Sequence, residues 1–391
     1  MRFSTFITSC LLVAGSARAA PQPSRVGAPT EAEITAMRIQ FLESAYNQTV
    51  TPAMVENVSS GAIRQLSATL AEKSQPKTAK QVGLTAAAAK ELEFAGLARN
   101  HAGPVDSATN TAVLRSTMYA AAAYCFKWHF NWNWNCNERC TNGLTDGTKM
   151  VDYFFKDSTT GFVAYNDAQK SVIVSFRGTL GPLNFFRDLQ LNVVPLDIGK
   201  TGGITPPPSD VRVHNGFQIT LEVARERVRK AVAGVLANPA RANYAVTVVG
   251  HSLGGAIATL ASIDLKDFLG NKNTVNAYTF GAPRVGNEAF AKWVDSLPIT
   301  ISRITALHDP IPTVPRREWY PLNYQHANTE FYTDAGKTIN KCTEPANGDE
   351  PADCLNGEPD LIGRDIASLL TPVWIFWHIN NYAKTVFGPW C

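Results

Sequence analysis

From about Asn110 onward, short apolar runs rich in β-branched residues alternate with stretches of helical periodicity. The apolar runs predict four strands: Ser171–Phe176, Tyr244–Val249, Asn276–Phe280 and Ile299–Ala306. The helical stretches are Val213–Leu236 and Gly255–Phe268. Strands that alternate with helices indicate an α/β fold with a mainly parallel central sheet.

Residues 21–103 have a different pattern, rich in Ala, Ser, Thr and Pro and without Cys or Trp. Their apolar positions are small and scattered, which predicts a weak core. Helical pieces are expected over Glu31–Tyr46, Gly61–Glu72 and Thr85–Asn100. Two interpretations remain open here: a pro-region that is removed after folding, or a helical N-terminal domain that stays.

The first residues have the pattern of a secretory signal. Arg2 supplies a positive charge, an apolar run follows, and Ala17-Arg18-Ala19 is a small-x-small cleavage site. We therefore expect a signal peptide over residues 1–19, a pro-region over 20–103 and an α/β domain over 104–391. The two N-x-[ST] sequons, Asn47 and Asn57, fall in the pro-region and predict a secreted glycoprotein.

Charge and hydropathy exclude several partners. Lys and Arg total 36 against 33 for Asp and Glu, a net charge of +3, and no basic cluster is present. Nucleic acid is therefore not expected as a partner. No stretch after the signal is long and apolar enough for a transmembrane span.

Six cysteines remain after the signal is removed, and an even number in a secreted chain predicts three disulfides. Zinc is the competing interpretation, since Cys136 and Cys140 could form half a site. The other cysteines are far away in sequence and no His pair has ligand spacing. We therefore expect no metal and no cofactor.

The strongest chemical signal is Gly250-His251-Ser252-Leu253-Gly254, a G-x-S-x-G between a strand and a helix. In this context the strand turns sharply into the helix and leaves the serine at the tip in a strained conformation. Side chains two residues before or after Ser252 would clash, so both positions are glycine. The helix N-terminus directs its amides at the reacting carbon. Ser252 is the candidate nucleophile.

A serine nucleophile needs a base, and the base needs a carboxylate that orients it. In α/β hydrolases the histidine follows both in sequence. His308 adjoins the candidate acid and suits the role poorly, while His326 lies in a polar loop. His378 lies near the C-terminus, after the last strand. We predict His378 as the base, with His326 as the alternative.

Asp309 is the candidate acid because it follows the strand that begins at Ile299, and the C-terminal ends of sheet strands commonly carry catalytic groups. Asp264, Asp267 and Asp295 fall in helical patterns and suit the role less well.

An oxyanion hole needs at least two donors. The backbone N–H of Leu253, directly after the nucleophile, is one candidate, and Thr179, in the loop after an earlier strand, is the other.

Five motifs together resemble those of a known family. They are Phe176-Arg177-Gly178-Thr179, Val213 to Phe217, Gly250 to Gly255, Thr279 to Asn287, and Asp309-Pro310-Ile311-Pro312. In this order they are similar to class 3 fungal lipases of the Rhizopus–Rhizomucor type, which are α/β-hydrolases, and the similarity extends over about Asn110 to Cys391. The resemblance implies the triad Ser252, Asp309 and His378, with Thr179 as oxyanion donor. It also implies a cleaved pro-region and the disulfides Cys125–Cys391, Cys136–Cys140 and Cys342–Cys354.

A lid is expected directly after the oxyanion loop. Leu183, Phe186 and Leu189 share one helical face, with Phe185 beside them. A core helix would give the same pattern, but a lid explains why this face follows Thr179. The chain departs from the family here, since Phe185 replaces the Trp common in such lids and Leu180 is followed by Gly181-Pro182.

These features predict a secreted, monomeric triacylglycerol lipase that meets its ester substrate at a lipid–water interface. The alternatives are a feruloyl esterase or phospholipase of the same fold, and a binding protein that has lost catalysis. An apolar lid with Phe185 and Phe186 favours the triacylglycerol lipase over a hydrolase of soluble esters, because a soluble ester would suit a polar lid.

Overall fold

The protein is described from a computed structural model. The structure describes residues 103–125, 134–157, 159–179, 192–198, 201–306, 309–315, 317, 323–327, 329–334, 337–355, 378–379, 382 and 385–388. The expected signal peptide, the expected pro-region up to residue 102 and the expected lid residues lie outside these ranges.

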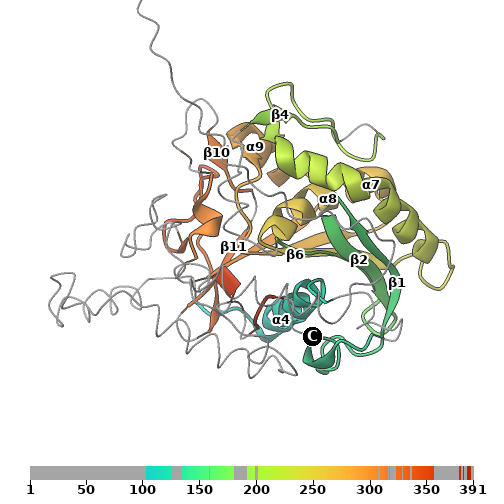
Figure 1. Cartoon of the computed structure of the whole chain (residues 1–391). Coiled ribbons are helices and arrows are strands. Elements are labelled where there is room, and N and C mark those ends of the chain that lie inside the picture. The colour runs from blue at the N-terminus through green and yellow to red at the C-terminus, as the bar shows by residue number, and fades with distance from the viewer. Residues whose placement is uncertain are drawn as a thin grey trace, which may run out of the picture.

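Within the described ranges, eight strands form one central sheet in the order β1-β2-β3-β6-β7-β9-β11-β12 (Figure 1). The strands are β1 (Thr148–Lys156), β2 (Thr159–Asn166), β3 (Ser171–Phe176), β6 (Ala245–His251), β7 (Val275–Phe280), β9 (Thr300–Ala306), β11 (Glu330–Thr333) and β12 (Ile339–Lys341). The central strands from β3 to β11 run parallel, whereas β1, β2 and β12 pair antiparallel at the two edges. The sheet is therefore mainly parallel, as expected.

Helices cover both faces of the sheet, with α4 on one face and α7 and α8 on the other (Figure 1). The helices and 3-10 turns are α4 (Ser107–Ala122), η3 (Asn137–Arg139), α7 (Asn215–Leu236), α8 (Leu253–Leu269), α9 (Glu288–Asp295) and η4 (Ile311–Thr313). Alternation along β3 divides the core: Ile173 packs on the α4 side, and Val172 and Val174 pack on the α7–α8 side. Such two-sided burial is typical of parallel sheets.

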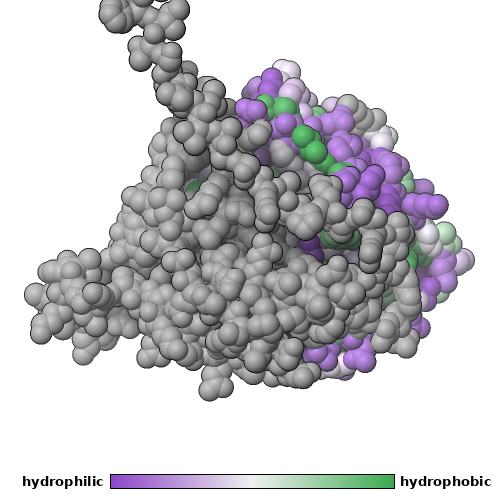
Figure 2. Space-filling view, viewed as in Figure 1, coloured by the Kyte–Doolittle hydropathy of each residue, from purple (hydrophilic) through white to green (hydrophobic). Residues whose placement is uncertain are grey.

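Local sequence explains these helices. α4 begins after Asp106, whose carboxylate accepts a hydrogen bond from Thr109 N at 2.7 Å, a side-chain N-cap. α7 buries Phe217, Leu221 and Val228 along one stripe. The opposite side of α7 faces solvent, and Figure 2 shows a mainly hydrophilic surface there.

A second, smaller sheet joins segments near α9 in the order β10-β8-β5-β4. Its strands are β4 (Val193–Pro195), β5 (Arg212–His214), β8 (Gly286–Asn287) and β10 (Tyr324–Gln325). The expected helix from Val213 thus begins two residues later, because residues 212–214 pair with β4 and β8.

Covalent and polar links join the ends of the domain. Disulfides join Cys136 to Cys140 and Cys342 to Cys354, two of the three pairings that the resemblance implied. Cys125 is also disulfide-bonded, and its expected partner, residue 391, lies outside the described ranges. The buried guanidinium of Arg139 donates to Val386 O at 2.9 Å and to Gly388 O at 2.7 Å. None of the described helices is both long enough and apolar enough to cross a bilayer.

Candidate active site

Ser252 lies at the turn from β6 into α8 with φ 58° and ψ −130°, outside the regions that residues with a side chain ordinarily adopt. A Cβ at Gly250 would lie 2.0 Å from Gly254 O, and one at Gly254 would lie 2.2 Å from Phe176 O. Glycine is therefore required on both sides of the serine, as the motif predicted. The geometry is that of a nucleophile elbow, with Ser252 N bound to Phe280 O at 2.8 Å.

Asp309 and His378 meet although 69 residues separate them in sequence. His378 Nδ1 lies 2.8 Å from Asp309 Oδ2, and both side chains are buried. Asp309 Oδ1 accepts from Ile311 N at 2.9 Å, which holds the carboxylate in place. A carboxylate on Nδ1 leaves Nε2 as the nitrogen that can exchange a proton with a nucleophile.

Tyr382 and Gly281 complete the surroundings of Asp309, and sequence reasoning assigned a role to neither. The Tyr382 hydroxyl donates to Asp309 Oδ2. Gly281 has φ +57°, and a Cβ there would lie 2.7 Å from Asp309 Oδ2 and 2.9 Å from His378 Cε1. Gly281 belongs to the motif from Thr279 to Asn287. The sequence therefore singled out this position, but it did not show that Asp309 and His378 approach it closely.

The loop after β3 packs directly on the elbow. A Cβ at Gly178 would lie 3.0 Å from Ser252 Cβ and 2.4 Å from Tyr124 Oη. Thr179, the next residue, has a buried Oγ1 without a hydrogen-bond partner among the residues that the structure describes. Leu253 opens α8 directly after Ser252. The two expected oxyanion donors thus flank the serine.

His251, the residue before the nucleophile, is buried against the base. Its Nδ1 lies 2.7 Å from Tyr124 Oη, and its Nε2 lies 2.9 Å from His378 O. Burial, followed by the charge of His378, holds the pKa of His251 well below its usual value. The sequence motif contains this histidine, but its contacts come from segments more than a hundred residues away on either side.

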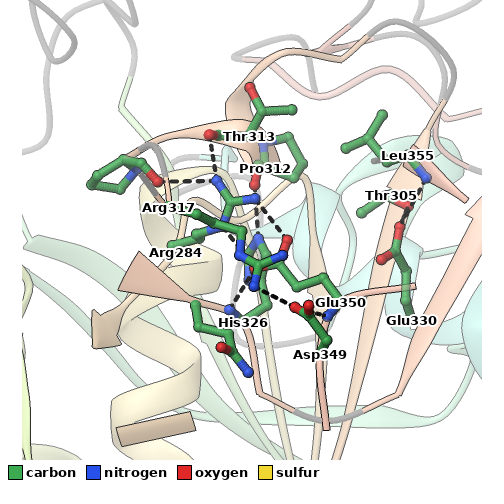
Figure 3. A network of polar contacts seen from close by, with 12 residues as sticks. Arg284, Thr305, Pro312, Thr313, Arg317, His326, Glu330, Asp349, Glu350 and Leu355 are labelled. Carbon is green, nitrogen blue, oxygen red and sulfur yellow. Dashed lines mark hydrogen bonds and ion pairs between the residues drawn. The ribbon is translucent and has the colours of Figure 1, made fainter. Parts of the chain in front are cut away.

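His326, the alternative base, lies in a separate polar network (Figure 3). Its Nε2 lies 2.8 Å from Pro312 O, and its backbone N donates to Glu350 Oε1 at 2.8 Å. Glu350 also binds Arg284 through two contacts of 2.7 Å. Burial and then the positive charge of Arg303 hold the pKa of His326 well below its usual value. The structure brings His378, rather than His326, to Asp309.

Arg284 binds the main chain that follows Asp309. Its Nη1 donates to Thr313 O and, at 3.0 Å, to Pro315 O. The Arg284–Glu350 ion pair is buried, with the two side chains 3% and 2% exposed. The network therefore links the chain after Asp309 to the loop around residue 350.

One group of described residues has metal-ligand spacing: Glu330, Cys342 and Cys354. The two cysteines are joined in a disulfide, which leaves no thiolate for a metal. Glu330 instead binds Arg303 Nη2 at 3.1 Å. This group is therefore a structural one.

Known proteins that are similar to this chain are lipases. The lipase (class 3) family model matches residues 173–319. A lipase of Rhizomucor miehei is 34% identical over 204 residues, which are 51% of this chain and 51% of that protein. Secreted mono- and diacylglycerol lipase 1 of Fusarium solani is 31% identical over 182 residues, 46% of this chain and 49% of that protein. The chain thus matches about half the length of these curated relatives.

Solved structures give a wider match. Lipase II from Rhizopus niveus superposes with a TM-score of 0.62 at 26% identity, covering 74% of this chain and 99% of that one. The Rhizomucor miehei lipase propeptide complex superposes with a TM-score of 0.57 at 25% identity, covering 72% of this chain and 83% of that one. The chain therefore has the α/β-hydrolase fold of the Rhizopus and Rhizomucor lipases, and its residues 173–319 match the lipase (class 3) family.

Proposed function

We propose that this protein is a secreted triacylglycerol lipase in which Ser252, His378 and Asp309 form the catalytic triad. The observation that carries the proposal is the buried 2.8 Å contact of His378 Nδ1 with Asp309 Oδ2 beside a serine held at φ 58°. The class 3 lipase domain supports the reaction class, and the names of the Fusarium and Rhizomucor relatives support secretion and a lipid substrate.

The chemistry follows from the positions of these groups. Ser252 Oγ attacks the ester carbonyl carbon while His378 Nε2 takes the hydroxyl proton. The tetrahedral intermediate collapses, its bond to the alcohol oxygen breaks, and His378 returns the proton to the leaving alcohol. Water, deprotonated by the same nitrogen, then attacks the acyl carbon. The bond from that carbon to Ser252 Oγ breaks, His378 returns the proton to Oγ, and the fatty acid leaves. Asp309 orients the imidazole and stabilises its charged form throughout.

Negative charge on the carbonyl oxygen needs donors placed before it develops. The backbone N–H of Leu253 and Thr179 are the proposed donors. The position of Gly178 against Ser252 Cβ supports this assignment, because it holds the Thr179 loop at the serine. The buried Thr179 Oγ1 offers a further donor from the same residue.

The proposed partner is a lipid–water interface, which a monomeric enzyme meets through a lid formed by Leu183, Phe185, Phe186 and Leu189. The pro-region is proposed to leave after folding, and a relative whose structure is named as a propeptide complex supports that assignment.

The test is the hydrolysis of a triglyceride emulsion and of a short-chain p-nitrophenyl ester by Ser252→Ala, His378→Ala and His326→Ala. Loss of a triad member is expected to lower kcat by about four orders of magnitude or more, with the fold unchanged by circular dichroism. His326→Ala tests the alternative base. A Ser252→Ala enzyme that retains a tenth of the original rate would overturn the proposal. Normal turnover in His378→Ala together with an inactive His326→Ala would assign the role of the base to His326.

A further inference from the structure

A buried chain of hydrogen bonds lies behind the candidate triad, and the mechanism above makes no use of it. Tyr124 Oη lies 2.7 Å from His251 Nδ1, and His251 Nε2 lies 2.9 Å from His378 O. Gly178 packs directly against the Tyr124 hydroxyl, because a Cβ there would lie 2.4 Å from Oη. Each of these residues is buried. These contacts connect the loop that carries Thr179, the turn after α4, the end of β6 and the segment of the base.

The acceptor at His378 O sets the donor and acceptor roles of both hydrogen bonds of the His251 ring. A carbonyl oxygen can only accept, so His251 Nε2 carries the hydrogen that reaches His378 O. If Nε2 holds the hydrogen of a neutral ring, Nδ1 must accept, and Tyr124 donates its hydroxyl hydrogen to it. The Tyr124 hydroxyl and both ring nitrogens of His251 are therefore satisfied when His251 is neutral.

Neutrality also suits the neighbouring base. The His251 and His378 rings lie 4.4 Å apart between centroids, and the His251 ring stacks on Phe387 at 3.8 Å. A second cation at this distance would oppose the imidazolium that His378 must form. Burial and the charge of His378, in that order, hold the pKa of His251 well below its usual value, so the ring stays neutral during turnover.

We propose that His251 is a positioning residue, which with Tyr124 couples the oxyanion loop to the main chain of His378 so that donors and base keep one geometry. This inference rests on the proposed triad. Asp309 fixes the imidazole from the side-chain end, and His251 fixes the same residue at its carbonyl. Displacement of a catalytic group by about 1 Å can cost about 100-fold in rate, so the loss of the contact at the His378 carbonyl is expected to lower turnover.

Two amide substitutions separate the two bonds of the His251 ring. His251→Gln places an amide nitrogen near the position of Nε2 and can still donate to His378 O. His251→Asn reaches only the position of Nδ1 and loses that bond. On a soluble short-chain ester, we expect kcat to fall within about 5-fold in His251→Gln and by about 100-fold in His251→Asn, with KM within about 2-fold in both.

Two buried tyrosines five residues apart supply the matched control: Tyr119 lies on α4 and Tyr124 in the turn after it. Tyr124→Phe removes the bond to His251. Tyr119→Phe removes bonds to Thr148 at 2.8 Å and to Gln169 at 3.0 Å, which lie away from the serine. Both changes should lower the melting temperature, but only Tyr124→Phe should lower kcat, by about 10-fold.

The outcomes separate this inference from the proposed function. Turnover by the wild type that disappears in Ser252→Ala establishes the triad serine whatever the His251 variants do. The inference would be overturned if kcat were equal in His251→Asn and His251→Gln, or equal in Tyr124→Phe and Tyr119→Phe. The hydrogen bonds of Tyr124 and His251 would then have a structural role only. The tyrosine pair gives the answer even if His251→Asn does not fold. Independently of turnover, the proton between His378 Nδ1 and Asp309 should exchange faster by NMR in Tyr124→Phe than in Tyr119→Phe.

Discussion

Tyr382 donates a hydrogen bond to Oδ2 of Asp309, the carboxylate oxygen that also receives His378 Nδ1. With the contact from Ile311 N on Oδ1, the buried carboxylate has three donors around it. These donors hold both carboxylate oxygens in place against the His378 ring.

Tyr382→Phe should therefore remove one hydrogen bond that holds Asp309 in place and leave the carboxylate itself intact. One charge-assisted hydrogen bond contributes about 1.5–3 kcal/mol, so we expect a roughly 10-fold fall in kcat. An unchanged kcat would show that Tyr382 serves packing alone.

Gly281→Ala should damage the site because the new methyl group would lie 2.7 Å from both Asp309 Oδ2 and Tyr382 Oη. The positive φ of 57° adds backbone strain. We expect activity to fall by about 100-fold or more, as for other displacements of catalytic groups. Gly234→Ala is the matched control, since its Cβ would meet nothing within 4 Å on helix α7. That change should raise stability by about 0.5–1 kcal/mol and leave turnover unchanged.

Glu350 should make stability depend on pH. Burial raises the pKa of Glu350, but the charge and hydrogen bonds of Arg284 outweigh it and hold this pKa well below 4.5. A depressed carboxyl pKa contributes stability that is present above the unfolded value and is lost as the pH falls through the folded value. The loss should therefore begin near pH 4.5 and continue below it.

Glu350→Gln tests this contribution by leaving the Arg284 charge buried without its partner. The variant should lose about 3–5 kcal/mol of unfolding free energy at neutral pH and show a flatter curve below pH 4.5 in urea titrations. Glu288→Gln breaks an exposed ion pair with Lys292 and should cost less than about 1 kcal/mol. Equal losses in the two variants would contradict the role assigned to the buried pair.

If residues 180–190 form the proposed lid, the rate of hydrolysis should be higher on emulsified ester than on monomeric ester. Each large apolar side chain that a lipid surface accepts stabilises the open state by roughly 1.5–3 kcal/mol. Replacing Leu183, Phe185 and Phe186 by Ser should flatten the rise in activity from monomeric to emulsified ester and spare short-chain ester hydrolysis. Equal loss on both substrates would place these residues in the core or the acyl pocket instead.

The N-terminal segment should be absent from the mature protein. N-terminal sequencing of secreted material is expected to give a start after about residue 90, if a pro-region is removed. An active form that begins at residue 20 or 21 would show that the segment remains.

Sequence predicted the parts of the site that have a local signature. Ser252 stands in a motif whose glycines are dictated by neighbours within two residues, and β3 was predicted with its observed bounds. β1, β2 and α4 were not predicted. A register shift between Met150 and Asp152 interrupts the alternation of β1, and the apolar face of α4 consists largely of alanine, which gives weak periodicity.

The contacts of Asp309 Oδ2 have no local signature in the sequence. Tyr382 reaches it across 73 residues and His378 across 69. The link from Tyr124 to His251 spans 127 residues. Such pairs depend on which strands become neighbours in the sheet, which no short window of sequence contains.

The reach of these contacts has a consequence for biosynthesis. His251 lies between Tyr124 and His378, 127 residues from each, and Arg139 holds the main chain at Val386 and Gly388. A nascent chain that has left the ribosome only as far as residue 350 already contains Ser252 and Asp309, but not the proposed base. The proposed triad is therefore completed by a residue that is synthesised after every strand that the structure describes in the central sheet.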